Sequence, residues 1–184
     1  MKLKSIDEKM SQFSIKSYVQ KTHDENEVKD IEKSLSIDLP EDYKNFLLKY
    51  GECMIMEDDL VFPVLEDNPL ADEGVMSFGF FYGLEKNRYD IRNIRDIYFD
   101  QMPEWVLPIA DAEGGDQICI AVKGEKTGKI YFWDHELRNG QQDLFLIANS
   151  FNDFIQSLFV QETSEDGKDD GIVSFELDED LLND

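Results

Sequence analysis

The stretch Leu39-Pro40-Glu41-Asp42-Tyr43-Lys44-Asn45-Phe46-Leu47-Leu48-Lys49-Tyr50-Gly51 carries the clearest structural signal in this chain. Proline is tolerated in the first turn of a helix, and the two carboxylates that follow it suit the positive end of the helix dipole. The apolar side chains at positions 43, 46, 47 and 50 repeat with the spacing of one helix face, and Gly51 comes where helices often end in a left-handed residue. We therefore predict an amphipathic helix that begins near Pro40 and ends at Gly51.

Outward from this helix, apolar spacings of three and four predict a helix from Asn26 to Ile37 and another over 90–98. A closing helix should begin near Ser150, a good N-cap residue with Asp153 three positions later. Between the helices lie short runs of apolar and β-branched residues: 53–56, 60–62, 77–82, 105–110, 116–122 and 129–134. The last two runs are joined by a loop with two glycines, so we expect them to form a hairpin.

This order of elements predicts an α+β fold, in which antiparallel strands are covered by helices. A chain of 184 residues is long enough for one domain with its own core. We expect an N-terminal arm (1–25) that either adds a strand or stays loose, a core domain (26–161) and an acidic C-terminal tail (162–184). The tail contains ten Asp or Glu residues and one lysine. It is either a solvated segment or, through its apolar islands, a segment that docks on a partner.

The formal net charge is -23 at pH 7. Such a charge repels phosphates, so we expect neither a nucleic acid nor an anionic membrane surface as a ligand. It favours a basic protein partner, because a strong negative field speeds the association of cations; the plain alternative is that it only keeps the protein soluble. The N-terminus has no apolar stretch of the kind found in secretion signals, and the longest apolar run, 78–84, is too short to span a membrane. We therefore expect a cytoplasmic protein.

The cysteines and histidines do not form a recognisable ligand pattern. Cys53 and Cys119 have no paired spacing, which is typical of small buried apolar residues in a reducing compartment. His23 and His135 are scattered relative to them, so we expect no zinc site. The loop 124–129 lacks the spacing of a phosphate-binding loop, and a calcium loop that starts at Asp111 would have valine in place of its last carboxylate ligand. We expect no metal and no cofactor.

Several carboxylates cluster at the ends of the predicted strands. The run Asp134-His135-Glu136 follows one strand, and the loop with Asp111, Glu113 and Asp116 joins two others. Such a group resembles the acid–base pair of a hydrolase, with or without a divalent ion. A chain with 41 acidic residues produces such clusters by chance, so we expect a protein that is not an enzyme.

Three motifs together resemble the SUKH superfamily, of the Smi/Knr type. The first is the opening stretch, 39–51. The second is Leu107-Pro108-Ile109-Ala110-Asp111 with Gly114-Gly115-Asp116-Gln117-Ile118-Cys119, and the third is Gly128-Lys129-Ile130-Tyr131-Phe132-Trp133-Asp134-His135-Glu136. They occur in the family's order and span about residues 26–160. In this chain Glu52 follows Tyr50-Gly51, where many relatives continue with another glycine.

The resemblance implies an α+β fold with a mixed or antiparallel sheet and packed helices. It also implies an immunity protein that binds and neutralises a cognate bacterial toxin, often a nuclease or deaminase. Fungal relatives regulate cell-wall synthesis through protein contacts, so the alternative is a regulatory or scaffold protein of the same fold. Neither branch has an established catalytic centre. Because nucleases approach phosphates and tend to be basic, an acidic inhibitor would complement them electrostatically.

We predict that the partner contacts nine polar residues: Glu57, Asp58, Asp59, Asp111, Glu113, Asp116, Asp134, His135 and Glu136. Two of them have a purely structural alternative. Asp116 follows two glycines and is placed to cap a turn, and Asp134 is placed to close the hairpin. The pair Glu66-Asp67 and the tail are further candidate contacts. The oligomeric state is left open by the sequence.

Overall fold

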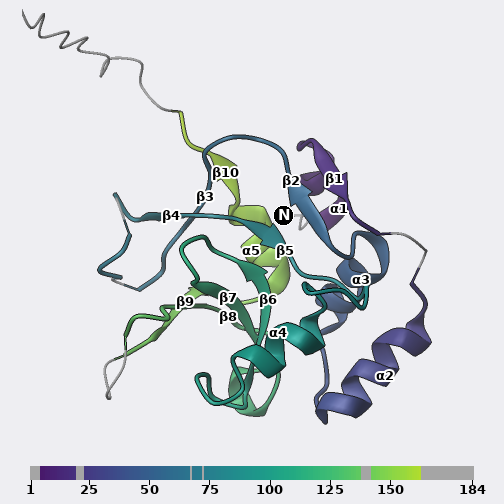
Figure 1. Cartoon of the computed structure of the whole chain (residues 1–184). Helices are drawn as coiled ribbons and strands as arrows, with labels where there is room; N and C mark the ends of the chain where they lie inside the picture. The colour runs from purple at the N-terminus through teal and green to yellow at the C-terminus, as the bar shows by residue number, and fades with distance from the viewer. Residues whose placement is uncertain (1–4, 20–22, 67, 72, 138–141, 163–184) are drawn as a thin grey trace, which may run out of the picture.

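The computed structural model describes residues 5–19, 23–66, 68–71, 73–137 and 142–162 (Figure 1). Its helices are α1 (Ile6–Met10), α2 (Glu25–Leu35), α3 (Glu41–Lys49), α4 (Ile91–Ile97) and α5 (Phe151–Ser157), with a short 3-10 turn at Gly124–Lys126. Its strands are β1 (Ile15–Ser17), β2 (Cys53–Ile55), β3 (Leu60–Pro63), β4 (Val75–Ser77), β5 (Phe80–Phe81), β6 (Val106–Asp111), β7 (Gln117–Ala121), β8 (Ile130–Trp133), β9 (Leu144–Ala148) and β10 (Phe159–Val160). The predicted α+β class is confirmed.

The strands form two antiparallel sheets. The larger has the order β1-β2-β5-β6-β7-β8-β9, and the smaller has the order β10-β3-β4. The predicted hairpin is confirmed as β7 and β8, which pair from Gln117↔Trp133 to Ile120↔Ile130. Helix α5 packs against β9 of the larger sheet and β3 of the smaller one, and Figure 1 shows it near the centre of the molecule.

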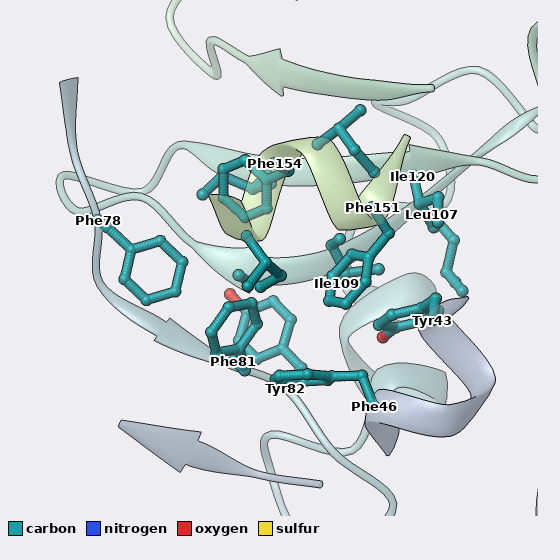
Figure 2. Close-up of a cluster of buried hydrophobic side chains, with 14 of the residues drawn as sticks. Tyr43, Phe46, Phe78, Phe81, Tyr82, Leu107, Ile109, Ile120, Phe151 and Phe154 are labelled. Atoms are coloured by element: carbon teal, nitrogen blue, oxygen red, sulfur yellow. The ribbon is translucent and has the colours of Figure 1, made fainter. Parts of the chain in front are cut away.

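Helix α3 forms as predicted and supplies the centre of the core. Gly51, just beyond its end, has a φ of 56°, the left-handed conformation that glycine adopts at little cost. Phe46 lies 4.6 Å from Phe81 of β5 and 5.0 Å from Phe151 of α5, ring centre to ring centre (Figure 2). Because each of these rings is almost completely buried, each stabilises the fold by about 1.5–3 kcal/mol through removal from water. One aromatic cluster therefore joins α3, the larger sheet and α5.

The other predicted helices also form. The side chain of Asp24 accepts hydrogen bonds from the first turn of α2, where Glu27 completes a capping box. The Ser150 side chain accepts a hydrogen bond from the amide of Asp153 at the start of α5, as predicted. Both helices bury apolar side chains against the core. Among the described helices, none is both long enough and apolar enough to cross a membrane.

Much of the segment expected as an N-terminal arm is packed onto the fold. Met10 of α1 is fully buried, and β1 pairs with β2 through Ile15↔Ile55 and Ser17↔Cys53. The strand that the sequence left open is therefore an edge of the larger sheet. Residues 163–184 of the predicted tail lie outside the described residues.

Both cysteines are buried in the core, as their sequence context predicts. Cys53 lies in β2 and Cys119 in β7, and neither thiol is exposed to solvent. Burial raises the pKa of the Cys53 thiol to about 12 and also raises that of Cys119. Because the thiolate is the reactive form, burial and the raised pKa disfavour both thiols as nucleophiles at neutral pH.

Candidate functional site

A cavity of about 480 Å³ brings together two acidic groups that are far apart in the sequence. Its lining includes Glu57, Asp58 and Asp59 from the β2–β3 loop. It also includes Asp111 at the end of β6 and Glu113 in the β6–β7 loop. We call this the acidic cavity. Five of the nine predicted contact residues therefore share one hollow, a proximity that no spacing in the chain indicates.

The β2–β3 loop passes from one sheet to the other. Strand β2 belongs to the larger sheet and β3 to the smaller one, so the acidic loop crosses between them instead of closing a hairpin. Asp59 has a φ of 56°, a left-handed conformation that aspartate tolerates better than most side chains. The amide of Ser14 donates to Glu57 Oε1 over 2.7 Å and ties the loop to the N-terminal segment. The loop is thus held at the junction of the two sheets.

Gly79 also lines the acidic cavity and lies against Asp111. Its amide donates to the backbone oxygen of Asp111 over 3.0 Å. A Cβ at this position would lie 2.6 Å from Asp111 Oδ2 and 2.9 Å from the Asp111 backbone oxygen. Only a glycine allows the β4–β5 connection to approach Asp111 this closely. Sequence reasoning did not single out Gly79, although a glycine inside an aromatic run is a known sign of close backbone approach.

The acidic cavity has a concentrated negative charge. Among the described residues, none of its five carboxylates forms an ion pair with a lysine or arginine. Glu57 Oε2 is buried and lacks a hydrogen-bond partner among the described residues. Burial raises the pKa of Asp111, and the negative charge of Asp116 raises it further. These carboxylates therefore favour an approaching cation, which would relieve both the desolvation and the mutual repulsion.

Asp116, Asp134 and His135 form a second cluster at the adjacent ends of β7 and β8. Ligand atoms from these three side chains lie within 4.8 Å of one another. Asp116 Oδ1 accepts from the His135 amide over 3.0 Å and lies 2.7 Å from His135 Nδ1. Asp134 is 3% exposed, and its Oδ1 accepts from the amides of Glu136 and Leu137.

These hydrogen bonds agree with the structural alternative for the two aspartates. Asp134 caps the turn that follows β8, and Asp116 ties the β6–β7 loop to that turn. Two carboxylates and an imidazole are donors that divalent ions accept. However, one oxygen of each aspartate is already committed to backbone amides, which accounts for the cluster without a ligand. Glu136 is exposed and is not part of the acidic cavity lining.

A buried polar network that sequence reasoning missed lies beside this cluster. The Tyr82 hydroxyl donates to Gln117 Oε1 over 2.6 Å, and Gln117 Nε2 donates to the Tyr98 hydroxyl over 3.2 Å and to the backbone oxygen of Asp116 over 2.7 Å. Burial raises the pKa of Tyr82, as does the charge of Asp111. The signal in the sequence was Gln117 itself, a single amide within an apolar strand. Through Gln117 the network holds the end of the β6–β7 loop in place.

Glu66, a further candidate contact, has a structural role in the fold. Its Oε2 accepts a hydrogen bond from the Leu146 amide over 2.9 Å, so it anchors β9. Its sequence neighbour Asp67 lies outside the described residues. The acidic cavity is thus the stronger candidate site.

Comparison with known proteins assigns the chain to a family. The model of the SMI1 / KNR4 family (SUKH-1) matches residues 23–157, which include all of the acidic cavity. The chain belongs to this family. The SUKH-1 match agrees with the three sequence motifs, whose residues form α3, the β6–β7 pair and β8 of the core. These motifs therefore specify core elements, with Asp111 at the end of β6, whereas Glu57, Asp58 and Asp59 of the acidic cavity come from a loop outside the motifs.

Two individual proteins are also similar to this chain. The SPbeta prophage-derived uncharacterized protein YokK of Bacillus subtilis (strain 168) is 37% identical over 194 residues, and the alignment covers 100% of each chain. A crystal structure of a protein from Pseudomonas syringae pv. tomato has a TM-score of 0.49 and 18% sequence identity. It covers 82% of this chain and 93% of its own.

Proposed function

We propose that this SUKH-1 protein is an immunity protein, which binds and neutralises a cognate bacterial toxin and catalyses no reaction. The partner surface we expect is basic, of the kind that a nuclease presents to phosphates. The observation that carries the proposal is the acidic cavity, where five carboxylates share one hollow without a cationic partner among the described residues. Family membership and a relative of prophage origin support it.

The mechanism we propose is electrostatic capture followed by occlusion. The negative field accelerates encounter with a basic surface, by roughly tenfold or more at low ionic strength. Lysine or arginine side chains of the toxin then enter the acidic cavity and pair with its carboxylates. Because the same basic residues would hold the toxin's own substrate, their capture blocks substrate access. The toxin need not be unfolded or chemically altered.

The test begins with the product of a toxin gene encoded beside this protein. The complex is measured by surface plasmon resonance at several salt concentrations, for the wild type and two charge-matched variants. One variant carries Asp58→Asn, Asp59→Asn and Glu113→Gln in the acidic cavity. The other carries Glu25→Gln, Asp30→Asn and Asp38→Asn on α2 and the segment after it, away from the β2–β3 loop (Figure 1).

Both variants lose three negative charges, so the comparison isolates position from net charge. We expect the cavity variant to weaken binding by about tenfold or more at low salt and the α2 variant to weaken it by less than about threefold. The difference should shrink as salt screens the charges. Equal effects of the two variants would refute the cavity as the binding face. A pull-down that recovers several housekeeping proteins and no toxin would refute immunity and favour a regulatory role.

A further inference from the structure

A second cavity, of about 370 Å³, lies beside the acidic cavity and has different chemistry. Its walls include the rings of Tyr18, Phe80 and Tyr89, and its lining also includes Glu52. We call it the Glu52 cavity. Phe80 lines both cavities, so the two are neighbours on one surface. None of the residues that distinguish the Glu52 cavity was predicted as a contact from the sequence.

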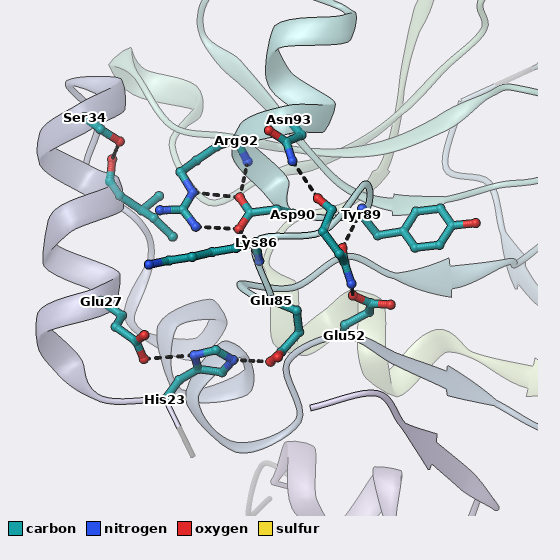
Figure 3. Close-up of polar contacts among 12 residues, drawn as sticks. His23, Glu27, Ser34, Glu52, Glu85, Lys86, Tyr89, Asp90, Arg92 and Asn93 are labelled. Carbon is teal, nitrogen blue, oxygen red and sulfur yellow. Dashed lines mark hydrogen bonds and ion pairs between the residues drawn. The ribbon is translucent and has the colours of Figure 1, made fainter. Parts of the chain in front are cut away.

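Glu52 is an unusual residue to find buried. It is only 4% exposed, and Asn87 Nδ2 donates to its Oε2 over 2.6 Å (Figure 3). Among the described residues, none donates a hydrogen bond to Glu52 Oε1 and none forms an ion pair with this carboxylate. A buried carboxylate is unfavourable unless it is neutralised or paired with a cation. The carboxylate is therefore a ready acceptor for a cation that enters the cavity.

The aromatic walls are suited to the same kind of ligand. Phe80 and Tyr89 meet edge to face, with ring centres 4.7 Å apart. The guanidinium carbon of Arg88 already lies 4.4 Å from the centre of the Tyr89 ring, and Lys16 Nζ lies 5.1 Å from the centre of the Tyr18 ring. Aromatic faces attract cations, and more strongly where water is excluded. Two rings of this cavity thus hold cationic groups of the protein itself.

The loop that completes the cavity is held rigidly. Asp90 is 1% exposed; burial alone would raise its pKa, but hydrogen bonds from Arg92 outweigh that effect and lower the pKa below its usual value. The Lys86 amide donates to Asp90 Oδ2 over 3.0 Å, and the Tyr89 amide donates to Asn87 Oδ1 over 2.7 Å. Figure 3 shows Glu52 and Tyr89 on one side of this loop and Asp90 with Arg92 on the other. A rigid site loses little entropy when it binds.

We propose that the Glu52 cavity receives an arginine side chain of the partner protein, whose guanidinium donates to Glu52 Oε1 and stacks on the aromatic walls. Arginine fits better than lysine because its planar guanidinium both stacks on rings and pairs with a carboxylate. Buried arginine and aromatic contacts are typical of the few residues that dominate binding energy in an interface. The inference rests on the proposed function, since it supplies an anchor next to the acidic cavity.

The test uses a small probe, so it does not depend on the toxin. The amide spectrum of the labelled full chain is titrated with Nα-acetyl-arginine amide, with Nα-acetyl-lysine amide and with the neutral Nα-acetyl-citrulline amide. We expect the arginine probe to shift resonances of the 52–54 and 87–89 segments, and the citrulline probe to bind at least about tenfold more weakly. Glu52→Gln should weaken the arginine probe about tenfold while it keeps the acceptor for Asn87. Tyr89→Leu should weaken it about fivefold.

Glu125→Gln is the matched control, because it removes the same charge from an exposed side chain in the Gly124–Lys126 turn, outside both cavities and outside the predicted contact set. It should leave the binding of the arginine probe unchanged. Shifts that spread over many acidic residues and survive Glu52→Gln would overturn the proposal, and equal binding of the lysine probe would overturn the choice of arginine. If the probe binds as expected but no toxin does, the cavity stands and the immunity function fails. If a toxin binds and Glu52→Gln does not weaken that complex, the immunity function stands and the role of the Glu52 cavity fails.

Discussion

Replacement of Gly83 by alanine should destabilise the protein strongly, because Gly83 lies against the backbone of Glu52. A Cβ on Gly83 would lie closest to the Glu52 amide nitrogen. It would also lie 2.7 Å from the Glu52 Cβ and 2.8 Å from the Glu52 Cα. Ordinary contacts begin at 3.4 Å, so the two segments would have to separate by at least about 0.7 Å to relieve the contact with the Glu52 Cβ, and by more to relieve the contact with the amide nitrogen. The obstacle is backbone, which cannot rotate away as a side chain can.

The cost can be built from its parts. Overpacking of this kind typically costs about 1–3 kcal/mol. The separation would also strain two backbone hydrogen bonds, from the Tyr18 amide to the Glu52 oxygen and from the Gly83 amide to the Tyr89 oxygen. Each contributes about 1 kcal/mol. We expect Gly83→Ala to lower the free energy of unfolding by about 3–5 kcal/mol, which corresponds to a fall in Tm of about 6–20 °C for a protein of this size.

Urea denaturation followed by tryptophan fluorescence measures this cost, since Trp133 is 2% exposed and reports on the core. Gly74→Ala is the control. A Cβ at Gly74 meets nothing within 4 Å, but the residue has a φ of 80°, so alanine there should cost only about 1–2 kcal/mol of backbone strain. If Gly83→Ala proved less costly than Gly74→Ala, the reasoning from close backbone approach would be refuted. The Gly83 variant should also lose the arginine probe, because Glu52 would move.

Two further predictions concern single side chains. Burial and the charge of Asp116 raise the folded-state pKa of Asp111, so its ionised carboxylate opposes folding at any pH above that value. Asp111→Asn should therefore increase the free energy of unfolding at pH 7. This gain should fade as the pH falls towards 3.8, the pKa of the aspartate side chain in the unfolded chain. Urea denaturation across this pH range measures the gain, and a gain that grew in acid would contradict the argument. Ser150→Ala removes the acceptor for the Asp153 amide and should lower the free energy of unfolding by about 1 kcal/mol. Ser150→Asp should restore most of that stability, because aspartate is also a good N-cap residue. Equal Tm values for all three proteins would show that the cap is unimportant.

The candidate sites differ in how far the sequence could have revealed them. The sequence singled out the carboxylates of the acidic cavity as candidate contacts, but as two unrelated groups. Their meeting depends on Gly79, whose close approach to Asp111 joins the β4–β5 connection to β6. Glu52 was noticed only as a departure from the family pattern, because an acidic residue at the start of a strand is exposed in most proteins.

The sequence alone determined the elements whose signals are local. The periodicity of 39–51 was sufficient for α3, the two β-rich runs around Gly124 and Gly128 were sufficient for the β7–β8 hairpin, and three motifs were sufficient for the family. Only the tertiary structure decided that β2 pairs with β5 in the larger sheet and that β3 belongs to the smaller sheet. Helix and hairpin patterns arise from neighbours in the chain, whereas strand order is selected by the packing of the whole core. Both cavities lie between segments brought together by that packing, so their chemistry becomes visible only in the folded chain.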